Sequence, residues 1–513
     1  MVSLLAAGAV AALVPVLAPI TASATGEPLG QHLQQKPAPV TGDPLGQYLR
    51  QKPTWHRCGK TLPATFQCAT IKVPLDYSRP GGTKLDLAIS RMTTSTKKQR
   101  RGVLLLNPGG PGGTGLDEPT DRASVLPKSV LRKYDLVGFD PRGVGSSSPV
   151  GCGLTSEEQN RERPYRAETF AKDVQWARTV AEKCDAKQGD KLRHITTRNT
   201  ARDMDVIRAL LGEKKISYFG VSYGTYLGAV YTQMFPQRVD RFVLDSAADP
   251  ARVWRGTIQL FAEGAEPAFT MWTKWTAQRN STYKLGGTPE AVRKAYYDLV
   301  AQADRKPIHV DGTALTGDDI RSQSRGMFFD VRYAADWILQ VNKAAKRTAP
   351  SARQNRKAPT QAPPSPGSAE PEDNEEAAFW SIACADTRDW PRDPQQYRDD
   401  AIRDKAAYPL YGDFASNIKP CAFWKQGSEP ATRVDNKVAA LILQYEWDSQ
   451  TPLTSGQGLR RVMKGAKMVT VTAGVGHGVY GSETCADKTA TAYLTTGKLP
   501  AKDVTCKDRT ATP

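Results

Sequence analysis

The chain has 513 residues, of which 39% are apolar and 24% charged, and its formal net charge is +17 at pH 7. This composition is that of a globular protein and excludes a disordered or fibrous chain, and the length predicts two domains or one heavily elaborated fold. After residue 24 no stretch approaches the ~20 apolar residues that a membrane span needs. The positive charge could favour an anionic cell envelope, but no nucleic-acid motif accompanies it, so a solvated basic surface is the preferred interpretation.

Residues 1–24 carry no charged side chain and end in Ala-Ser-Ala, which is typical of a secretory signal and its cleavage site. The basic start of such a signal is missing, and the alternative, a buried N-terminal helix, is disfavoured by Pro15 and Pro19. The sequence therefore predicts a secreted, extracellular protein. Residues 25–54 contain a polar near-duplication, "GEPLGQHLQQKP" and "GDPLGQYLRQKP", and are expected to form a pro-segment or N-terminal arm.

Eight cysteines are consistent with an exported protein, and none of them forms a CxxC pair, so neither thioredoxin-type chemistry nor a zinc ribbon is supported. Eight cysteines allow 105 connectivities, and pairing of sequence neighbours is the simplest hypothesis. It gives the disulfides Cys58–Cys68, Cys152–Cys184, Cys384–Cys421 and Cys485–Cys506.

From Leu85 onward, predicted strands and helices alternate. "LDLAISRM", "GVLLLNPGG" and "YDLVGFDPRG" are expected strands, and an amphipathic helix follows, capped by Asn199 or Thr200 and closed by Gly212. A strand ("ISYFGVS"), a helix ("YGTYLGAVYTQMF") and a strand ("RVDRFVLDSA") come next. This alternation predicts a mostly parallel α/β sheet with right-handed crossovers.

The alternation stops between Asp249 and about Val434, where tryptophan-rich helical stretches surround a proline-rich run at 348–376 that is expected to be a loop or cleavable linker. The pattern then resumes with "KVAALILQYEWD" and "AKMVTVTAGVGHG". The predicted organisation is therefore a core in two parts, separated by a large, mainly helical lid insertion. The expected ranges are 55–249 and 434–513 for the core and 250–433 for the lid.

Ser222 lies in "FGVSYGTYLG", a G-x-S-x-G pentapeptide with a predicted strand before it and a predicted helix after it. A nucleophile elbow needs this context, and it needs small flanking residues because bulky ones would clash with the strand and helix. Gly220 and Gly224 provide them. A serine in an ordinary glycine-rich loop is the alternative.

A serine nucleophile needs a histidine base, and the chain order in this type of site is serine, acid, histidine. Of the five histidines, only two follow Ser222, and one of them, His309, falls in the insertion. His477, in a glycine-rich loop after a predicted strand, remains. The acid is expected at the end of the preceding strand, where Asp448 is preferred over Glu446 because it stands farther past the strand end.

The developing oxyanion of acyl transfer needs hydrogen-bond donors. The amide of Tyr223, directly after the serine, and those of Gly109 and Gly110, in the loop "NPGGPGGTG", are the predicted donors. The loop lacks the GK[ST] ending of a P-loop. No metal and no organic cofactor is implied.

The sequence resembles the secreted bacterial tripeptidyl aminopeptidases. These enzymes are α/β-hydrolases related to proline iminopeptidases and carry a TAP-like C-terminal domain. The matching segments are "NPGGPGGTG", "DLVGFDPRGVGSSSP", "YFGVSYGTYLGAVYTQMFPQRVDRFVLDSAADP", "CAFW" and "DSQTP". The resemblance implies an α/β-hydrolase fold, the triad Ser222, Asp448 and His477, and release of short peptides from free N-termini. It departs at Glu446, where Tyr-Glu replaces the usual glycine-led start of the acid loop.

The resemblance also implies acidic side chains near the lid that bind the substrate ammonium group. Asp386 and Glu376 are the candidates, although a solvated acidic run is the preferred interpretation of "EDNEE". The expected partners are peptides or proteins with a free N-terminus, and the enzyme is expected to be a monomer. The alternatives are a carboxylesterase or lipase with the same triad, and an inactive binding protein.

Overall fold

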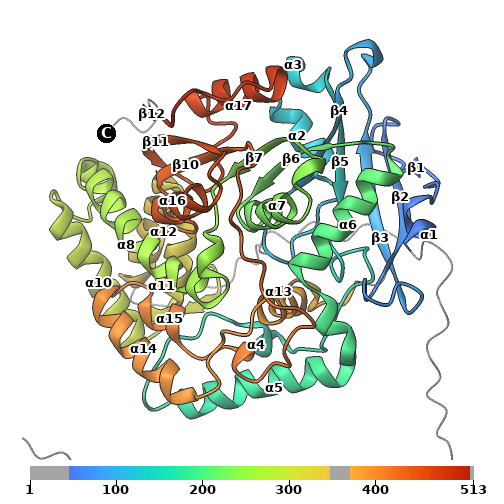
Figure 1. The fold of residues 1–513 in the computed structure, drawn as a ribbon. Coiled ribbons are helices and arrows are strands. Elements are labelled where there is room, and N and C mark those ends of the chain that lie inside the picture. The colour runs from blue at the N-terminus through green and yellow to red at the C-terminus, as the bar shows by residue number, and fades with distance from the viewer. Residues whose placement is uncertain (1–44, 347–369, 509–513) are drawn as a thin grey trace, which may run out of the picture. The chain divides into compact units, whose positions relative to one another are not determined.

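A ten-stranded sheet forms the centre of the described chain (Figure 1). The structure is a computed structural model that describes residues 45–346 and 370–508. The predicted signal, most of the N-terminal arm and most of the proline-rich run lie outside these residues. The strands, in spatial order, are β1 (His56–Arg57), β2 (Phe66–Pro74), β3 (Lys84–Met92), β5 (Tyr134–Phe139), β4 (Gly102–Asn107), β6 (Ile216–Val221), β7 (Val239–Asp245), β10 (Leu441–Trp447), β11 (Lys467–Val475) and β12 (Val504–Lys507).

All strands from β5 to β12 in this order run parallel, whereas β1, β2 and β3 pair antiparallel with their neighbours. The predicted mostly parallel sheet is therefore confirmed. The register places Gly220 of β6 opposite both Asn107 of β4 and Leu244 of β7, so these three strands end at the same edge. The loops that follow β4, β6, β7, β10 and β11 meet there, which brings distant sequence segments together.

Helices cover both faces of the sheet because its central strands are apolar on both sides. Val103 and Leu105 of β4 pack into one buried cluster with α6 and α7, and the alternate residues Leu104 and Leu106 pack into another with α17. The helices of the α/β part with residues in the first cluster include α5 (Phe170–Gln188), α6 (Thr197–Leu210), α7 (Tyr223–Met234) and α16 (Leu453–Val462). Those in or against the second cluster are α2 (Glu118–Val125), α3 (Lys128–Leu131) and α17 (Cys485–Thr496).

Helix α6 begins earlier than the sequence predicted. Its N-cap is Thr196, not Asn199 or Thr200, and the Thr196 side chain accepts a hydrogen bond from the backbone N–H of Asn199. The Asn199 side chain instead donates to the carbonyl of His194. Both residue types make good caps, and the extended backbone of Thr196 decides where the helix starts. Gly212, with a φ of 72°, follows the helix end as predicted.

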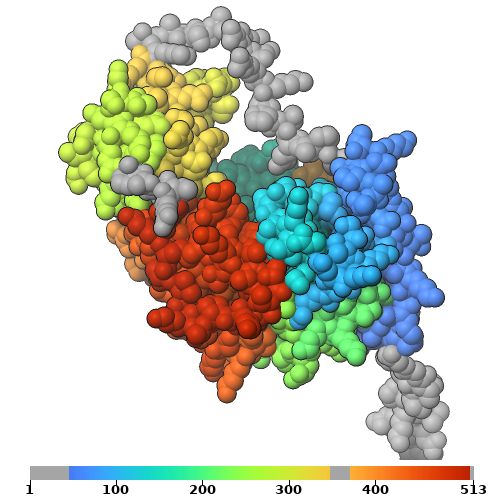
Figure 2. All heavy atoms as spheres, turned by 90° about the horizontal axis from the view of Figure 1, so that it is seen from above, coloured from blue at the N-terminus to red at the C-terminus, as the bar shows by residue number. Residues whose placement is uncertain are grey.

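The chain between β7 and β10 is mainly helical, with one small hairpin. Its elements are α8 (Arg255–Ala277), α9 (Asn280–Tyr283), α10 (Pro289–Arg305), β8 (Ile308–Val310), β9 (Thr313–Leu315), α11 (Gly317–Met327), α12 (Val331–Ala345), α13 (Asn374–Ala385), α14 (Pro394–Ala407) and α15 (Gly412–Ser416). Residues of α8, α10, α11, α12 and α15 share a buried cluster of their own, whereas α13 packs into the main core. Figure 2 shows α8 to α12, in yellow-green to yellow, gathered in a lobe beside the red C-terminal part. Residues 374–376, predicted to belong to a loop, form the first turn of α13.

Short elements complete the described chain: α1 (Gly46–Leu49), α4 (Ser156–Gln159) and the 3₁₀ helices η1 (Lys97–Gln99), η2 (Gly189–His194), η3 (Pro236–Arg238), η4 (Pro250–Arg252) and η5 (Pro420–Ala422). Four disulfides join the same cysteine pairs that the sequence suggests: Cys58–Cys68, Cys152–Cys184, Cys384–Cys421 and Cys485–Cys506. Within residues 45–346 and 370–508, no helix has both the length and the apolar character required to cross a bilayer.

Candidate active site

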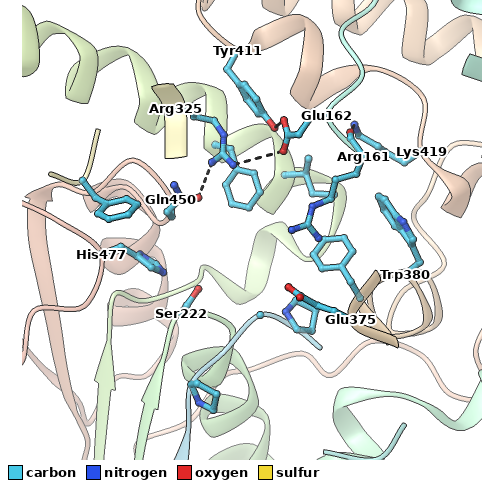
Figure 3. A pocket seen from close by; sticks show the side chains of 17 residues that line it. Arg161, Glu162, Ser222, Arg325, Glu375, Trp380, Tyr411, Lys419, Gln450 and His477 are labelled. Carbon is cyan, nitrogen blue, oxygen red and sulfur yellow. Dashed lines mark hydrogen bonds and ion pairs between the residues drawn. The ribbon is translucent and has the colours of Figure 1, made fainter. Parts of the chain in front are cut away.

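Ser222 occupies the turn between strand β6 and helix α7. Its φ of 56° and ψ of −123° put it in a backbone conformation that residues with a side chain adopt only under strain. Its backbone N–H donates to the carbonyl of Asp245 over 3.0 Å, which holds the turn against β7. The side chain faces a cavity of about 420 Å³ that His477 also lines (Figure 3). These features are those of a nucleophile elbow.

The two glycines that flank the serine leave no room for a side chain. A Cβ at Gly220 would lie 2.5 Å from the carbonyl oxygen of Gly224 and from the Tyr218 ring. A Cβ at Gly224 would lie 2.8 Å from the Asn107 side-chain oxygen and 2.9 Å from its carbonyl oxygen. The strand and helix therefore approach closely at the elbow, which is the steric reason for the G-x-S-x-G pattern.

His477 follows strand β11 and is hydrogen-bonded to Asp448, which follows β10. The Nδ1 atom of the ring lies 2.9 Å and 3.1 Å from the two carboxylate oxygens of Asp448. The Asp448 side chain is fully buried, while that of His477 is 20% exposed and reaches the cavity. This leaves Nε2 as the ring nitrogen that can take a proton from a substrate-side group. No hydrogen bond joins Ser222 to the His477 ring within the described residues, and such bonds commonly tighten only when substrate binds.

The structure distinguishes the two candidate acids. The Asp448 carboxylate also accepts hydrogen bonds from the N–H groups of Gln450 and Thr451 and from the Thr451 hydroxyl, at 2.8–2.9 Å, which fix its orientation. Glu446 instead accepts a 2.7 Å bond from the N–H of Ala473 on β11. Asp448, and not Glu446, is therefore the carboxylate beside His477.

The electrostatics of His477 suit a base. Burial alone would lower the pKa of His477, but the neighbouring Asp448 carboxylate outweighs this effect, with a smaller contribution from Asp245, and the net shift is upward from the ordinary value of 6.5. Proton transfer from the serine hydroxyl converts His477 to an imidazolium, and the raised pKa means that this charged form is stabilised.

A second acidic residue, Asp245 at the end of β7, holds the histidine loop through the backbone. Its carboxylate oxygens accept hydrogen bonds from the N–H groups of Val479 (2.7 Å) and Tyr480 (2.8 Å). The adjacent Ser246 hydroxyl accepts a bond from the N–H of Gly478. The three residues after His477 are thus attached to the strand next to the elbow. Sequence reasoning missed this role, although the position of Asp245 at a strand end could have indicated it.

The predicted oxyanion donors are close to the elbow, but they are not equivalent. A Cβ at Gly109 would lie 3.0 Å from the Ser222 Cβ and 3.3 Å from the Tyr223 nitrogen, so the loop packs directly on the turn. The N–H of Gly109 is already used, because it donates to the Asn107 side-chain oxygen over 3.2 Å. Gly110 lines the cavity. The N–H of Tyr223 belongs to the first residue of α7 and has no acceptor within the helix. Gly110 and Tyr223 therefore fit the role better than Gly109.

The walls of the cavity come from the segments that the sequence predicts as lid and from the chain before α5. Apolar side chains of Ile258, Phe261, Phe329, Phe379 and Trp380 face it, together with the charged residues Arg161, Glu162, Arg325, Glu375 and Lys419. Figure 3 shows the charged groups mostly on the side away from His477.

Most of the charged groups in the cavity have partners. Arg161 lies 3.3 Å from the carboxylate of Glu376, and Arg325 donates to Gln450 over 2.7 Å and lies 3.9 Å from Glu162. Burial lowers the pKa of Lys419 to about 8, and its ammonium donates to the carbonyl of Phe414. Glu162 also accepts a hydrogen bond from the Tyr411 hydroxyl.

Glu375 differs from these groups. Among the described residues it has neither an ion pair nor a hydrogen-bond partner for its carboxylate, and it is exposed to the cavity. Its charge acts on Arg161, whose pKa it helps to raise, but its carboxylate oxygens remain available to a ligand.

The two residues predicted to bind the substrate amine do not line the cavity. Asp386 is buried, and its carboxylate accepts hydrogen bonds from the N–H and hydroxyl of Thr197 (2.7 and 2.5 Å) and from the Trp254 indole (2.9 Å). Burial raises the pKa of Asp386 to about 6. The Thr197 hydroxyl in turn lies 2.9 Å from that of Tyr223. Asp386 thus supports the residue after the nucleophile and does not face substrate.

Glu376 is buried behind the cavity lining and is not exposed to the cavity. It pairs with Arg161, and burial raises the pKa of Glu376 to about 7 even though that arginine opposes the shift. The carboxylates that do line the cavity are those of Glu375 and Glu162. No sequence signal singled out Glu162, because only the fold brings residues 161–162 to the site.

Comparison with known proteins supports this assignment of the site to a hydrolase. A family described as "alpha/beta hydrolase fold" matches residues 102–266, and one described as "TAP-like protein" matches residues 408–506. The chain is 35% identical to a tripeptidyl aminopeptidase of Streptomyces lividans, over 90% of this chain and 87% of that protein. It is 29% identical to the serine protease Hip1 of Mycobacterium tuberculosis (87% and 88% covered) and 30% identical to carboxylesterase B of the same species (88% and 89% covered).

The fold and these relatives define a serine hydrolase of the α/β-hydrolase class. With this identity over nearly its whole length, the chain belongs to the family of the tripeptidyl aminopeptidases, as its motifs suggested.

Proposed function

We propose that this protein is a secreted serine exopeptidase that releases tripeptides from free N-termini through an acyl-enzyme on Ser222. The proposal rests on one observation: Ser222, His477 and Glu375 line the same cavity, and the Glu375 carboxylate has no hydrogen-bond partner among the described residues. A carboxylate of this kind suits the α-ammonium group of a peptide. The name of the Streptomyces relative supports the size of the product. Four disulfides support an oxidising, extracellular compartment.

In the proposed mechanism, Nε2 of His477 removes the Ser222 proton as the oxygen attacks the carbonyl of the scissile bond. Asp448 holds the ring with Nδ1–H facing the carboxylate and stabilises the imidazolium. The N–H groups of Gly110 and Tyr223 stabilise the tetrahedral oxyanion. His477 then protonates the leaving amine, the C–N bond breaks, and water hydrolyses the acyl-enzyme in the reverse sequence of proton transfers.

In this proposal, Glu375 binds the substrate ammonium and Glu162 contributes to the negative potential of the same end of the cavity. Glu375 has the greater role because Glu162 is already engaged with Tyr411 and Arg325. Charge-assisted hydrogen bonds of this kind contribute about 1.5–3 kcal/mol. Glu375→Gln should therefore raise KM for a free peptide about tenfold or more. Glu372→Gln, in the same acidic run but outside the cavity, is the matched control.

The decisive experiment compares a tripeptidyl p-nitroanilide with its N-acetylated form, a single-residue anilide and a short-chain ester. Rapid cleavage of the free tripeptide alone supports the proposal. Equal rates for the free and acetylated forms would contradict the exopeptidase proposal, and only the assignment to the serine hydrolases would remain supported.

A carboxylesterase is the second candidate, favoured by the relative named carboxylesterase B. The same cavity could accept an ester, and the fold does not separate the two chemistries. Preference for the short-chain ester over every peptide would establish it. An inactive binding protein would fail to react with a fluorophosphonate probe.

A further inference from the structure

A second cavity, of about 460 Å³, is also lined by His477. His477 and Phe329 line both this cavity and the one that contains Ser222, whereas Ser222 lines only the first. The walls of the second cavity come from α8, from the turn between α11 and α12, and from the histidine loop. We call it the leaving-side cavity; its lining residues are Met271, Trp275, Phe329, Asp330, Val331, Arg332, Tyr445, Val475, Gly476, His477, Gly478, Ser482 and Asp508.

The order of the chemical steps assigns the two cavities. The acyl part of the substrate stays attached to Ser222 and must occupy the cavity that contains it. The leaving amine receives its proton from His477 and must depart on the side of that ring. We propose that the leaving-side cavity binds the first residue after the scissile bond, and that it selects a large apolar or aromatic side chain there. This inference rests on the proposed peptidase function and adds a second specificity site to it.

The chemistry of the walls gives the preference. Met271, Trp275, Phe329 and Val331 present apolar side chains, and the Phe329 side chain remains 43% exposed. The Trp275 ring is held by Arg279, whose guanidinium lies 4.1 Å from the ring centroid, and by Tyr283 at 5.6 Å. An aromatic ring fixed at the wall of a cavity is a typical anchor for an apolar side chain.

The histidine loop at the leaving-side cavity is closely packed. A Cβ at Gly476 would meet the Tyr445 ring at 2.9 Å, and one at Gly474 would meet it at 2.2 Å, so the histidine loop packs tightly on the buried Tyr445. The charged side chains of Asp330 and Arg332 are exposed. We therefore expect the cavity to bind an apolar side chain while these exposed groups remain in contact with water.

The first test uses the acyl-enzyme itself and does not depend on the length of the released peptide. An acyl-enzyme is formed from an activated substrate, and it then reacts either with water or with an added amine, Phe-NH₂ or Gly-NH₂. The amine nitrogen attacks the ester carbonyl, its proton passes through His477 to the Ser222 oxygen, and the C–O bond breaks to give an amide. Phe-NH₂ should capture the acyl group about tenfold better than Gly-NH₂, within the range that a hydrophobic pocket provides.

The second test measures kcat/KM for two pentapeptides that share one well-cleaved tripeptide and continue with Phe-Gly or Gly-Gly. We expect a preference for Phe of about tenfold. Trp275→Ala should reduce both this ratio and the ratio of the capture test to about one. Tyr333→Ala removes an exposed aromatic residue of α12 outside the cavity and should leave both ratios unchanged.

Equal values for Phe and Gly in both tests would overturn the leaving-side assignment while leaving the peptidase proposal intact. Capture of Phe-NH₂ without cleavage of any pentapeptide would support the cavity and contradict the exopeptidase function. If Trp275→Ala fails to fold, Met271→Ala gives an independent readout, since it removes another apolar side chain of the same cavity and should lower the preference for Phe over Gly. An unchanged preference in that variant would contradict the proposed binding mode.

Discussion

Val479 lies two residues after His477, and its backbone N–H donates a 2.7 Å hydrogen bond to the buried carboxylate of Asp245. Asp245→Asn replaces one of two accepting oxygens with a donor, so one of the bonds to Val479 and Tyr480 is lost. We expect kcat/KM to fall roughly 10–100-fold, by analogy with the loss of groups that orient site residues. Removing the negative charge should also lower the pKa of His477, which that charge raises. The acid limb of the pH profile of kcat/KM should therefore move to lower pH.

A purely structural role for Asp245 would lower activity without moving this limb. Asp240→Asn, on the same strand but in a surface ion pair with Arg101, is the matched control and should not alter the pH profile.

Ser222→Ala should lower kcat by roughly 10⁶, leaving only substrate binding and oxyanion stabilisation. The variant should keep its fold, since alanine removes only the hydroxyl, and it should lose reaction with a fluorophosphonate. Activity within tenfold of the parent enzyme would remove Ser222 from the mechanism. Burst kinetics with an activated substrate test the acyl-enzyme directly.

Asp448→Asn should lower kcat about 10⁴-fold, as expected when the orienting carboxylate of a triad is replaced. Glu446→Gln should have little effect on kcat, because Glu446 bonds to Ala473 and not to the histidine. The reverse order of effects would show that the carboxylates exchange roles when substrate binds.

The pH dependence follows from the raised pKa of His477. His477 must be neutral to act as a base, so kcat/KM should be low at acid pH and should rise as the pH increases through an apparent pKa above 6.5. A pH series of kcat/KM tests this expectation.

The contribution of His477 to the free energy of unfolding changes with pH in the opposite direction. The pairing of protonated His477 with Asp448 stabilises the fold fully below the unfolded pKa of about 6.5 and is lost as pH rises through the folded pKa. The difference in denaturation midpoint between the parent and Asp448→Asn enzymes should therefore become smaller at alkaline pH, while the part that comes from the bonds of Asp448 to Gln450 and Thr451 remains.

Gly224→Ala should destabilise the protein by about 1–3 kcal/mol, because the new methyl group would meet backbone and side-chain oxygens of Asn107. The elbow would shift as well, so activity should fall more than stability. Gly326→Ala is the control, since a Cβ there meets nothing within 4 Å. Urea denaturation and kcat/KM measured on both variants test this expectation.

The sequence predicted those parts of the protein that local pattern determines. Ser222 could be found because the turn requires glycine on both sides of the serine, and this requirement appears in the sequence as a G-x-S-x-G pattern. His477 could be found because only His309 also follows the serine. The fully buried strand β4 is visible as a continuous apolar run.

What the sequence could not show depends on contacts between distant segments. Nothing in "NRERPYR" indicates that Glu162 meets Arg325, from another part of the chain, at the cavity. Gly109 and Gly110 look alike in the sequence, and only the position of Asn107 separates them. The family resemblance implies acidic side chains near the lid and so points to Asp386 as an ammonium ligand, whereas the fold turns this carboxylate toward Thr197 and Trp254.

The sheet places β10, which Asp448 follows, directly beside β7, and β11, which His477 follows, beside β10. The chain nevertheless makes the whole series of helices α8 to α15 before it reaches these two strands. A growing chain that has completed the elbow therefore has a serine but no base and no acid. Hydrolytic activity can begin only after β10 and β11 have been synthesised and have paired with the strands made first. This order of assembly links the onset of activity to the completion of the parallel sheet.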